Sequence, residues 1–278
     1  MGMMRTILFA AGPISQGRIA CATSAGSVHR ARRFRCLRQM AKQPLRIAAT
    51  ADVHYAKHSR GMFHDAFAEI SSSADMLLLC GDLTDYGLPE EAEELVADIR
   101  AAVRIPTIAV LGNHDFESGQ PELVAKVLDD AGVNMLNGEA IEIAGVGFAG
   151  IAGFGGGFGR RMLNAWGEPL IKQFVQESIS HAVRLEQALA KLQTEKRIVV
   201  LHYSPIRATL QGEDPEIYAF LGSSRLEEPI NRFKVTAVFH GHAHNGILDG
   251  KTSTGIPVYN VSAPALTKTG KPYRIVEL

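Results

Sequence analysis

Residues 76–85 have the sequence MLLLCGDLTD, an apolar run that ends in a glycine followed by two carboxylates. A short apolar run with polar residues directly after it is typical of a buried strand. Because Gly81 has no side chain, the backbone there can turn closely around an ion or molecule that Asp82 binds. This stretch therefore predicts a strand of a buried sheet with a ligand-binding carboxylate at its carboxyl end.

The same arrangement of an apolar run and a polar group occurs four more times along the chain. The runs cover residues 45–51, 107–111, 198–201 and 235–239. The polar groups after them are, in order, Asp52-Val53-His54, Gly112-Asn113-His114-Asp115, His202 and Gly241-His242-Ala243-His244. Open α/β sheets bind their ligands at the carboxyl ends of the strands. We therefore expect the five polar groups to meet at one edge of the fold.

The segments between the first strands predict an α/β fold. Apolar residues at helical spacing predict helices over residues 63–70 and 89–100, and a third helix from Pro121 to near Gly132. Strand and helix then alternate through the first half of the chain. This alternation indicates a parallel wound unit.

The second half has a different pattern. Asn137-Gly138 and Gly145 predict hairpins within residues 133–151, and a helix is expected from about residue 174 to 192. The last eighty residues alternate short strands with turns. We expect two sheets packed face to face with helices outside, and a long loop over residues 203–229 that covers the site.

The side chains of the polar groups form a donor set for transition metals. Asp52 and His54 are two residues apart, so they point the same way on a regular strand. Asp82 offers a carboxylate that can bridge two cations, and Asn113 offers a neutral carbonyl oxygen suited to a terminal position. Oxygen and imidazole donors without a thiolate favour Mn, Fe or Zn over Mg or Ca. We predict two divalent or trivalent transition-metal ions.

The ordered motifs DxH, GDxxD, GNHD, a single His after a strand, and GHxH resemble the calcineurin-like metallophosphoesterase superfamily, from residue 45 to about residue 262. The resemblance implies a four-layer α/β/β/α sandwich with two mixed sheets. It also implies phosphoester hydrolysis by in-line attack of a hydroxide that bridges two metals. The ligands implied for one metal are Asp52, His54, Asp82 and His244. Those implied for the other metal are Asp82, Asn113, His202 and His242.

His114 directly follows Asn113 and resembles the general acid or phosphoryl-stabilising histidine of that superfamily. We predict that Asp85 orients His114 through a hydrogen bond, as carboxylates do for many catalytic imidazoles. The alternative role for Asp85 is a helix cap for the segment that starts near Leu88. The predicted catalytic residues are therefore His114 and Asp85.

Tyr86 departs from the superfamily pattern in a way that bears on the substrate. Many phosphoprotein and dinucleotide phosphatases of the superfamily carry Arg directly after GDxxD, and this chain has Tyr86 there. An arginine can bind a dianionic monoester through two hydrogen bonds, so its replacement favours a diester. We predict a phosphodiesterase for a small, soluble, nucleotide-like diester. Tyr86, Tyr203 and Arg225 are the candidates for substrate contacts.

Other functions use the same motifs. A phosphomonoesterase or a pyrophosphatase would need the same metals. A nuclease is disfavoured because Lys plus Arg and Asp plus Glu both number 29, and the chain has no basic, aromatic-rich stretch. A metal-binding scaffold without turnover is the alternative outside enzymes, but it would have no chemical need for His114.

Composition indicates the setting of the protein. Cys21, Cys36 and Cys80 show no paired spacing, which favours a reducing compartment. No apolar run approaches the roughly 20 residues that cross a bilayer. We expect a soluble, cytoplasmic protein without a membrane partner.

Residues 1–43 differ from the rest because they are rich in Arg, contain Ser and have no Asp or Glu. This composition matches an organellar transit peptide, while residues 6–11 are a short apolar run for a secretion signal. Met40 lies five residues before the first apolar run, so translation from an upstream start is the alternative. In both cases we predict a leader over residues 1–43 and a metallophosphoesterase domain over residues 44–278.

Overall fold

The apolar run at residue 45 leads into the first strand of a five-stranded sheet in the computed structural model, which describes residues 44–278. The predicted leader lies outside the described residues. The strand order is β11-β1-β2-β3-β4, in which β1 to β4 are parallel and β11 is antiparallel to β1. The strands are β1 (Arg46–Thr50), β2 (Met76–Cys80), β3 (Thr107–Val110), β4 (Asn134–Met135) and β11 (Arg274–Glu277).

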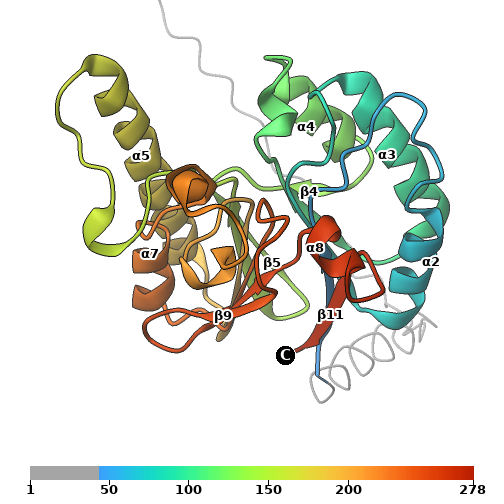
Figure 1. Cartoon of the computed structure of the whole chain (residues 1–278). Coiled ribbons are helices and arrows are strands. Elements are labelled where there is room, and N and C mark those ends of the chain that lie inside the picture. The colour runs from blue at the N-terminus through green and yellow to red at the C-terminus, as the bar shows by residue number, and fades with distance from the viewer. Residues whose placement is uncertain (1–43) are drawn as a thin grey trace, which may run out of the picture. The chain divides into compact units, whose positions relative to one another are not determined.

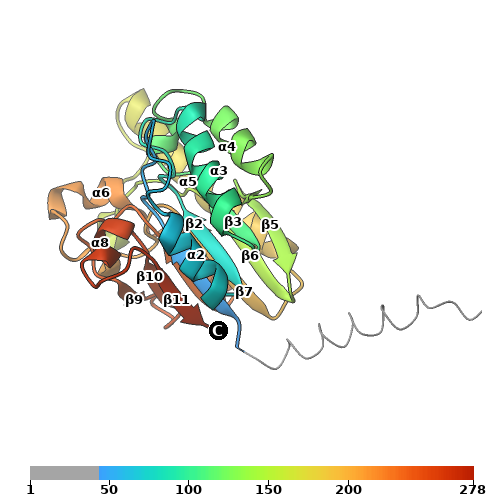
Figure 2. The same cartoon turned by 90° about the vertical axis from the view of Figure 1, so that its right-hand side faces the viewer.

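Three helices connect the parallel strands and cover one face of this sheet. They are α2 (His64–Ser73), α3 (Pro89–Ala102) and α4 (Pro121–Asp129). In α3, Pro89 occupies the first turn, and the Glu91 carboxylate accepts hydrogen bonds from the backbone amides of Leu88 and Tyr86. Figure 2 shows the three helices side by side across the sheet. The predicted wound unit is confirmed.

The second half of the chain forms a six-stranded mixed sheet with the order β5-β6-β7-β8-β10-β9. An antiparallel hairpin, β5 (Glu139–Ile143) and β6 (Val146–Ile151), forms one edge. The inner strands β7 (Lys196–Leu201), β8 (Ala237–His240) and β10 (Pro257–Asn260) run parallel to β6, and β9 (Asp249–Lys251) closes the other edge. Two helices, α5 (Pro169–Lys191) and α7 (Glu227–Arg232), pack on this sheet through Leu185, Leu189 and Ile230.

Alternating side chains divide the core between the layers. Leu77 and Leu79 of β2 pack under the helices of the first sheet, while Leu78 points to the opposite face. There Leu78 joins a core that contains Phe148 and Val200 of the second sheet. Figure 1 shows α2 to α4 on one side, α5 and α7 on the other, and the two sheets between them. The predicted four-layer α/β/β/α sandwich with two mixed sheets is confirmed.

Several elements differ from the sequence-based expectation. Helix α5 begins at Pro169, about one turn before the expected start, because proline is well suited to the first helical position. The loop expected over residues 203–229 is interrupted by short helices. These are η3 (Ala208–Leu210), η4 (Pro215–Ile217), α6 (Tyr218–Leu221) and the start of α7. The remaining short helices are η1 (His114–Phe116), η2 (Gly159–Arg161) and α8 (Ala263–Thr267).

No helix among residues 44–278 has the length and apolar character needed to cross a membrane.

We propose that residues 44–278 fold without the leader. The backbone amides of Leu45 and Leu278 each donate to the carbonyl oxygen of the other, so the core pairing begins at Leu45. Deletion of residues 1–39 should therefore leave the thermal midpoint and the activity unchanged. The measurement is thermal unfolding of both forms, loaded with the same metal. A drop of more than about 4 °C, roughly 1–2 kcal/mol for a domain of this size, would contradict the proposal.

Candidate metal centre

The predicted ligands lie at strand ends of both sheets, on tightly turned backbone. Asp52, His54, Asp82 and His242 all have positive φ angles, between 43° and 68°. Seven non-glycine residues between 44 and 278 have positive φ, and four of them are these candidate ligands. Such conformations cost on the order of 1–3 kcal/mol each and concentrate at functional sites. The strain thus marks the same strand ends that the motifs mark.

Two motif glycines let these strand ends approach one another. Gly81 has a φ of +86°, and a Cβ there would lie 2.5 Å from Nδ1 of His202. A Cβ at Gly112 would collide with the side chain and backbone nitrogen of Asp82 and lie 2.8 Å from Cε1 of His202. Side chains at either position would therefore separate Asp82, at the end of β2, from His202, at the end of β7.

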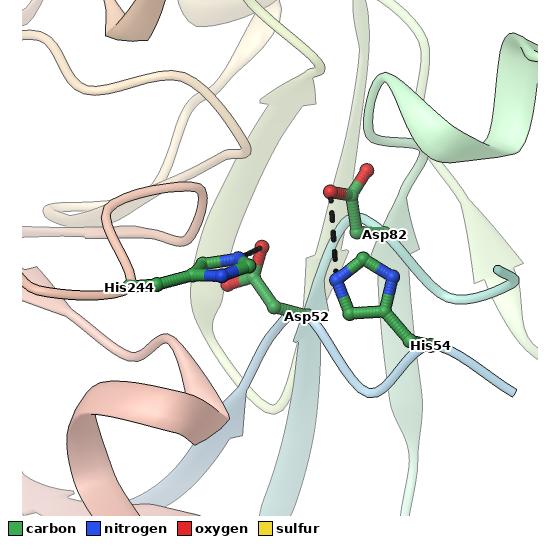
Figure 3. Close-up of side chains that lie close together, drawn as sticks. All are labelled: Asp52, His54, Asp82 and His244. Atoms are coloured by element: carbon green, nitrogen blue, oxygen red, sulfur yellow. Dashed lines mark ion pairs between the residues drawn. The ribbon is translucent and has the colours of Figure 1, made fainter.

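The first group of donors consists of Asp52, His54, Asp82 and His244, which place ligand atoms within 4.8 Å of one another (Figure 3). Nε2 of His244 lies 3.2 Å from Oδ1 of Asp52. Nε2 of His54 lies 4.0 Å from Oδ2 of Asp82. The backbone amide of His242 donates to the Asp52 carboxylate, which joins the end of β1 to the turn after β8.

The second group shares Asp82 with the first and adds His202 and His242. Nε2 of His202 lies 3.3 Å from Oδ1 of Asp82 and 3.1 Å from Nδ1 of His242. The same nitrogen lies 2.9 Å from Oδ1 of Asn113. Nδ1 of His202 is 3.0 Å from the Cys80 carbonyl oxygen and donates its hydrogen there, which directs Nε2 toward the other donors.

The convergence of these donors on Nε2 of His202 is better explained by a bound cation than by a shared proton. Nε2 of His202 faces a carboxylate oxygen, an amide oxygen and an imidazole nitrogen, and one hydrogen cannot serve all three. Burial disfavours protonation of His202, yet the charge of Asp82 raises its pKa to about 9. Burial and the neighbouring His202 lower the pKa of His242 to about 3. The donors supply oxygen and imidazole ligands of the kind that transition metals bind, and Asp82 belongs to both groups.

The sequence profile of calcineurin-like phosphoesterases matches residues 45–246. The chain belongs to the calcineurin-like phosphoesterase family. All candidate ligands of this phosphoesterase lie within the matched residues. The predicted family is confirmed, and membership brings with it the binuclear metal centres and the phosphoester hydrolysis of this family.

Solved structures support the fold of the phosphoesterase. The phosphopantetheinyl hydrolase of Mycobacterium tuberculosis has a TM-score of 0.61 at 15% identity, covering 84% of this chain and 96% of that chain. GAP50, the anchor in the inner membrane complex of Plasmodium, has a TM-score of 0.53 at 14% identity. The match covers 81% of this chain and 73% of GAP50. A Thermus thermophilus protein has a TM-score of 0.52 at 16% identity, covering 84% of this chain and 99% of that chain. No curated protein matches the sequence.

His114 lies beside the first donor group, with its ring centroid 4.5 Å from that of His54. Its backbone amide donates to Oδ1 of Asp82 over 2.8 Å. Nδ1 of His114 lies 2.7 Å from the backbone carbonyl oxygen of Asp85. Because a carbonyl oxygen only accepts, Nδ1 carries the hydrogen, and Nε2 is the nitrogen that can exchange a proton with a ligand.

The structure corrects the prediction for Asp85. The backbone carbonyl of Asp85 orients His114, and its carboxylate instead lies 3.6 Å from Nδ1 of His54. That nitrogen is buried and has no hydrogen-bond partner among the described residues. The side chain of Asp85 therefore lies next to the candidate metal ligand His54 without a hydrogen bond to it. It is not the helix cap, because Leu88 is the N-cap of α3 and Glu91 binds its backbone amide.

Asp115 joins two of the motifs. Its buried carboxylate accepts hydrogen bonds from the backbone amides of Leu83, Thr84 and Gly112 and from the hydroxyl of Thr84. Burial and the nearby charge of Asp82 raise the pKa of Asp115 to about 6, while the hydrogen bonds from Gly112 and Thr84 favour its ionised form. Asp115 thus holds the turn after β2 against the turn after β3.

The three candidate substrate contacts lie in different surroundings. The side chain of Tyr86 is 57% exposed. The ring of Tyr203 packs against the candidate ligand His242 at 4.5 Å, and burial raises the pKa of Tyr203 to about 12, so its hydroxyl keeps its hydrogen. Arg225 lies elsewhere: it donates to the carbonyl oxygen of Leu163 and lines a separate cavity of about 190 Å³ between α5 and α7.

A cavity of about 260 Å³ beside Asn113 includes residues that the motifs did not indicate. It is lined by Gly112, Asn113, Phe116, Ala152, Gly153, Phe154, Glu177, His181 and Tyr203. The glycine-rich loop after β6 supplies Phe154, and α5 supplies Glu177 and His181. One signal in the sequence was the spacing of Glu177 and His181, which lie four residues apart on one face of a helix.

Proposed function

We propose that this phosphoesterase is a phosphodiesterase that acts on small, soluble, nucleotide-like diesters. The observation that carries the proposal is that, among residues 44–278, no Arg or Lys forms an ion pair with the donor carboxylates Asp52 and Asp82. Their ion pairs within this part of the chain involve histidines only. The position after GDxxD holds the exposed Tyr86. A dianionic monoester would gain most from an arginine there, whereas a diester carries one charge for the metals to bind.

The metals in this proposal are held by the two donor groups. Asp52, His54, Asp82 and His244 would hold one metal, and Asp82, Asn113, His202 and His242 the other. Four imidazoles and no thiolate favour Mn, Fe or Zn over Mg or Ca. When bound, the two ions polarise phosphoryl oxygens and make water a nucleophile near neutral pH.

Side chains of the phosphoesterase complete the reaction. Burial opposes ionisation of Asp82, but the adjacent His202 lowers its pKa, so its carboxylate is anionic and available to both metals. His114 is fixed by the Asp85 carbonyl and presents Nε2 to the leaving alkoxide, to which it gives a proton. A metal-binding scaffold would not need this oriented imidazole. Its presence therefore supports catalysis over the scaffold alternative.

The substrate class is tested with a matched pair of aryl esters. We expect kcat/KM to be higher for methyl p-nitrophenyl phosphate than for p-nitrophenyl phosphate, because the position after GDxxD holds Tyr86 and offers no arginine to the monoester's second charge. Tyr86→Arg should shift the ratio toward the monoester, while Tyr86→Phe should leave it unchanged. Preference of the wild type for the monoester when loaded with Mn, Fe and Zn in turn would show a phosphomonoesterase instead.

A further inference from the structure

The cavity beside Asn113 adjoins the metal centre through two of its lining residues, Asn113 and Tyr203. Asn113 lines it, and Oδ1 of Asn113 lies 2.9 Å from the candidate ligand His202. Tyr203, another lining residue, packs on His242 with ring centroids 4.5 Å apart. Phe154 follows at 5.9 Å from Tyr203. A substrate whose phosphorus lies at the metals can therefore extend one ester group directly into this cavity.

The walls of the cavity favour a flat group. Phe116, Phe154 and Tyr203 present aromatic rings, and Gly112 and Gly153 contribute walls without side chains. A cavity of about 150 Å³ is enough for benzene, so 260 Å³ has room for a substituted or fused ring. No Arg or Lys is among the lining residues, so the cavity offers nothing for a second phosphate.

Helix α5 contributes a hydrogen-bonded pair to the cavity wall, Glu177 and His181. Nε2 of His181 lies 3.1 Å from Oε1 of Glu177. A carboxylate only accepts, so Nε2 carries the hydrogen of this bond. Burial lowers the pKa of His181, so the imidazole ring is neutral. His181 therefore does not neutralise the negative charge of Glu177. Glu177 is therefore a held carboxylate with capacity to accept further hydrogen bonds.

We propose that this cavity binds a planar nitrogen heterocycle of nucleobase size on one ester group of the substrate, with Phe154 stacking on the ring and Glu177 accepting from its N–H groups. His181 positions Glu177. The proposal rests on the proposed phosphodiesterase function and names the substrate class of the same site. Aromatic walls account for the ring, and a carboxylate acceptor in a lining that contains no Arg or Lys accounts for its N–H donors.

The test measures binding by calorimetry, with the full-length chain loaded with Mn²⁺. The probes are adenosine 5′-monophosphate, which has both the ring and the phosphate, and ribose 5-phosphate, which lacks the ring. We expect the former to bind roughly 5- to 150-fold more tightly, the range of base stacking on an aromatic side chain. Phe154→Ala should remove most of this difference. Glu177→Gln should reduce it about tenfold, since a neutral acceptor replaces a charged one.

Two controls separate the cavity from the rest of the protein. Glu186 lies on the same helix but outside the cavity. Glu186→Gln should therefore leave the affinities for both probes unchanged. Ribose 5-phosphate should bind all the variants equally, because its phosphate is held at the metals. His181→Ala should weaken only the nucleotide, and His181→Gln, which can still donate to Glu177, should restore part of the loss.

Three outcomes would overturn the proposal. Equal affinity of the wild type for the two probes would show that the ring is not bound. Equal loss of both probes in Phe154→Ala would show a general structural defect. Binding of phosphocholine that is stronger than that of the nucleotide and depends on Glu177 would show a cation site instead. Turnover of methyl p-nitrophenyl phosphate is measured separately, so its absence would count against the phosphodiesterase function and leave the binding result standing.

Discussion

Replacement of Asp82 by Asn should abolish turnover and leave the protein unable to hold two metals. Asp82 is the only residue shared by the two donor groups, and its oxygens lie 3.3 Å from His202 and 4.0 Å from His54. The carboxamide has nearly the same shape, but it carries no negative charge and offers only one acceptor oxygen. Removal of a residue that only hydrogen-bonds to a metal ligand already lowers metal affinity or activity about 10- to 100-fold. Loss of a shared ligand should cost at least about 100-fold in both.

The measurement is the metal content by elemental analysis, together with kcat/KM for a diester. Asp75→Asn is the matched control, because Asp75 pairs with Arg46 away from the metal centre. That control should keep two metals and full activity. An active Asp82→Asn protein with two bound metals would disprove the assignment of Asp82 as the shared ligand.

Replacement of His114 by Ala should retain both metals and lower the rate roughly 10²- to 10⁴-fold for a diester with an alkyl leaving group. The proposed ligand in this motif is Asn113, whose Oδ1 lies 2.9 Å from Nε2 of His202, whereas Nδ1 of His114 is bonded to the Asp85 carbonyl. An acid is needed most when the leaving alkoxide is strongly basic. The loss should therefore be much smaller for a p-nitrophenyl leaving group.

The dependence on the leaving group distinguishes proton donation from a structural role. Rates are measured for methyl p-nitrophenyl phosphate and for a dialkyl diester, with the metal content of each protein. His64→Ala, at the start of α2, is the control and should change neither rate. Equal losses for the two substrates would argue against His114 as the acid. Loss of one metal would instead make His114 a ligand.

The main features of the fold could be predicted from the sequence, because they depend on local patterns. Each run such as 76–80 is short, apolar and followed by a polar group, which specifies a buried strand and places a donor at its carboxyl end. Parallel strands in one sheet have their carboxyl ends at one edge, so the donors after β1, β2 and β3 had to meet. The donors after β7 and β8 belong to the second sheet, and the packing of the two sheets brings them to the first set. The first three helices were predictable for the same reason, since proline and apolar spacing are local signals.

The roles of Asp85 and Arg225 could not be predicted in this way. The distance along the chain allowed the Asp85 carboxylate to reach His114, but the turn after β2 directs the carbonyl oxygen there and the carboxylate toward His54. Arg225 lies in the segment after His202, yet it donates to the carbonyl oxygen of Leu163 and lines the separate cavity between α5 and α7. In both cases the hydrogen-bond partner is a backbone carbonyl oxygen, that of Asp85 for His114 and that of Leu163 for Arg225. Sequence motifs contain no information about where carbonyl oxygens point.

The pairing of β11 with β1 and the cavity beside Asn113 were decided only by the tertiary structure. The last strand pairs with the first through residues more than 220 positions apart, and nothing local to residues 274–277 indicates that partner. The cavity needs Asn113 from one sheet, Phe154 from a loop and Glu177 from a helix. The sequence by itself thus determined which donors exist and the strand ends that carry them, because side-chain chemistry and hydrophobic periodicity are properties of short segments. The space next to those donors depends on how the layers pack, because a cavity is bounded by residues that only folding brings together.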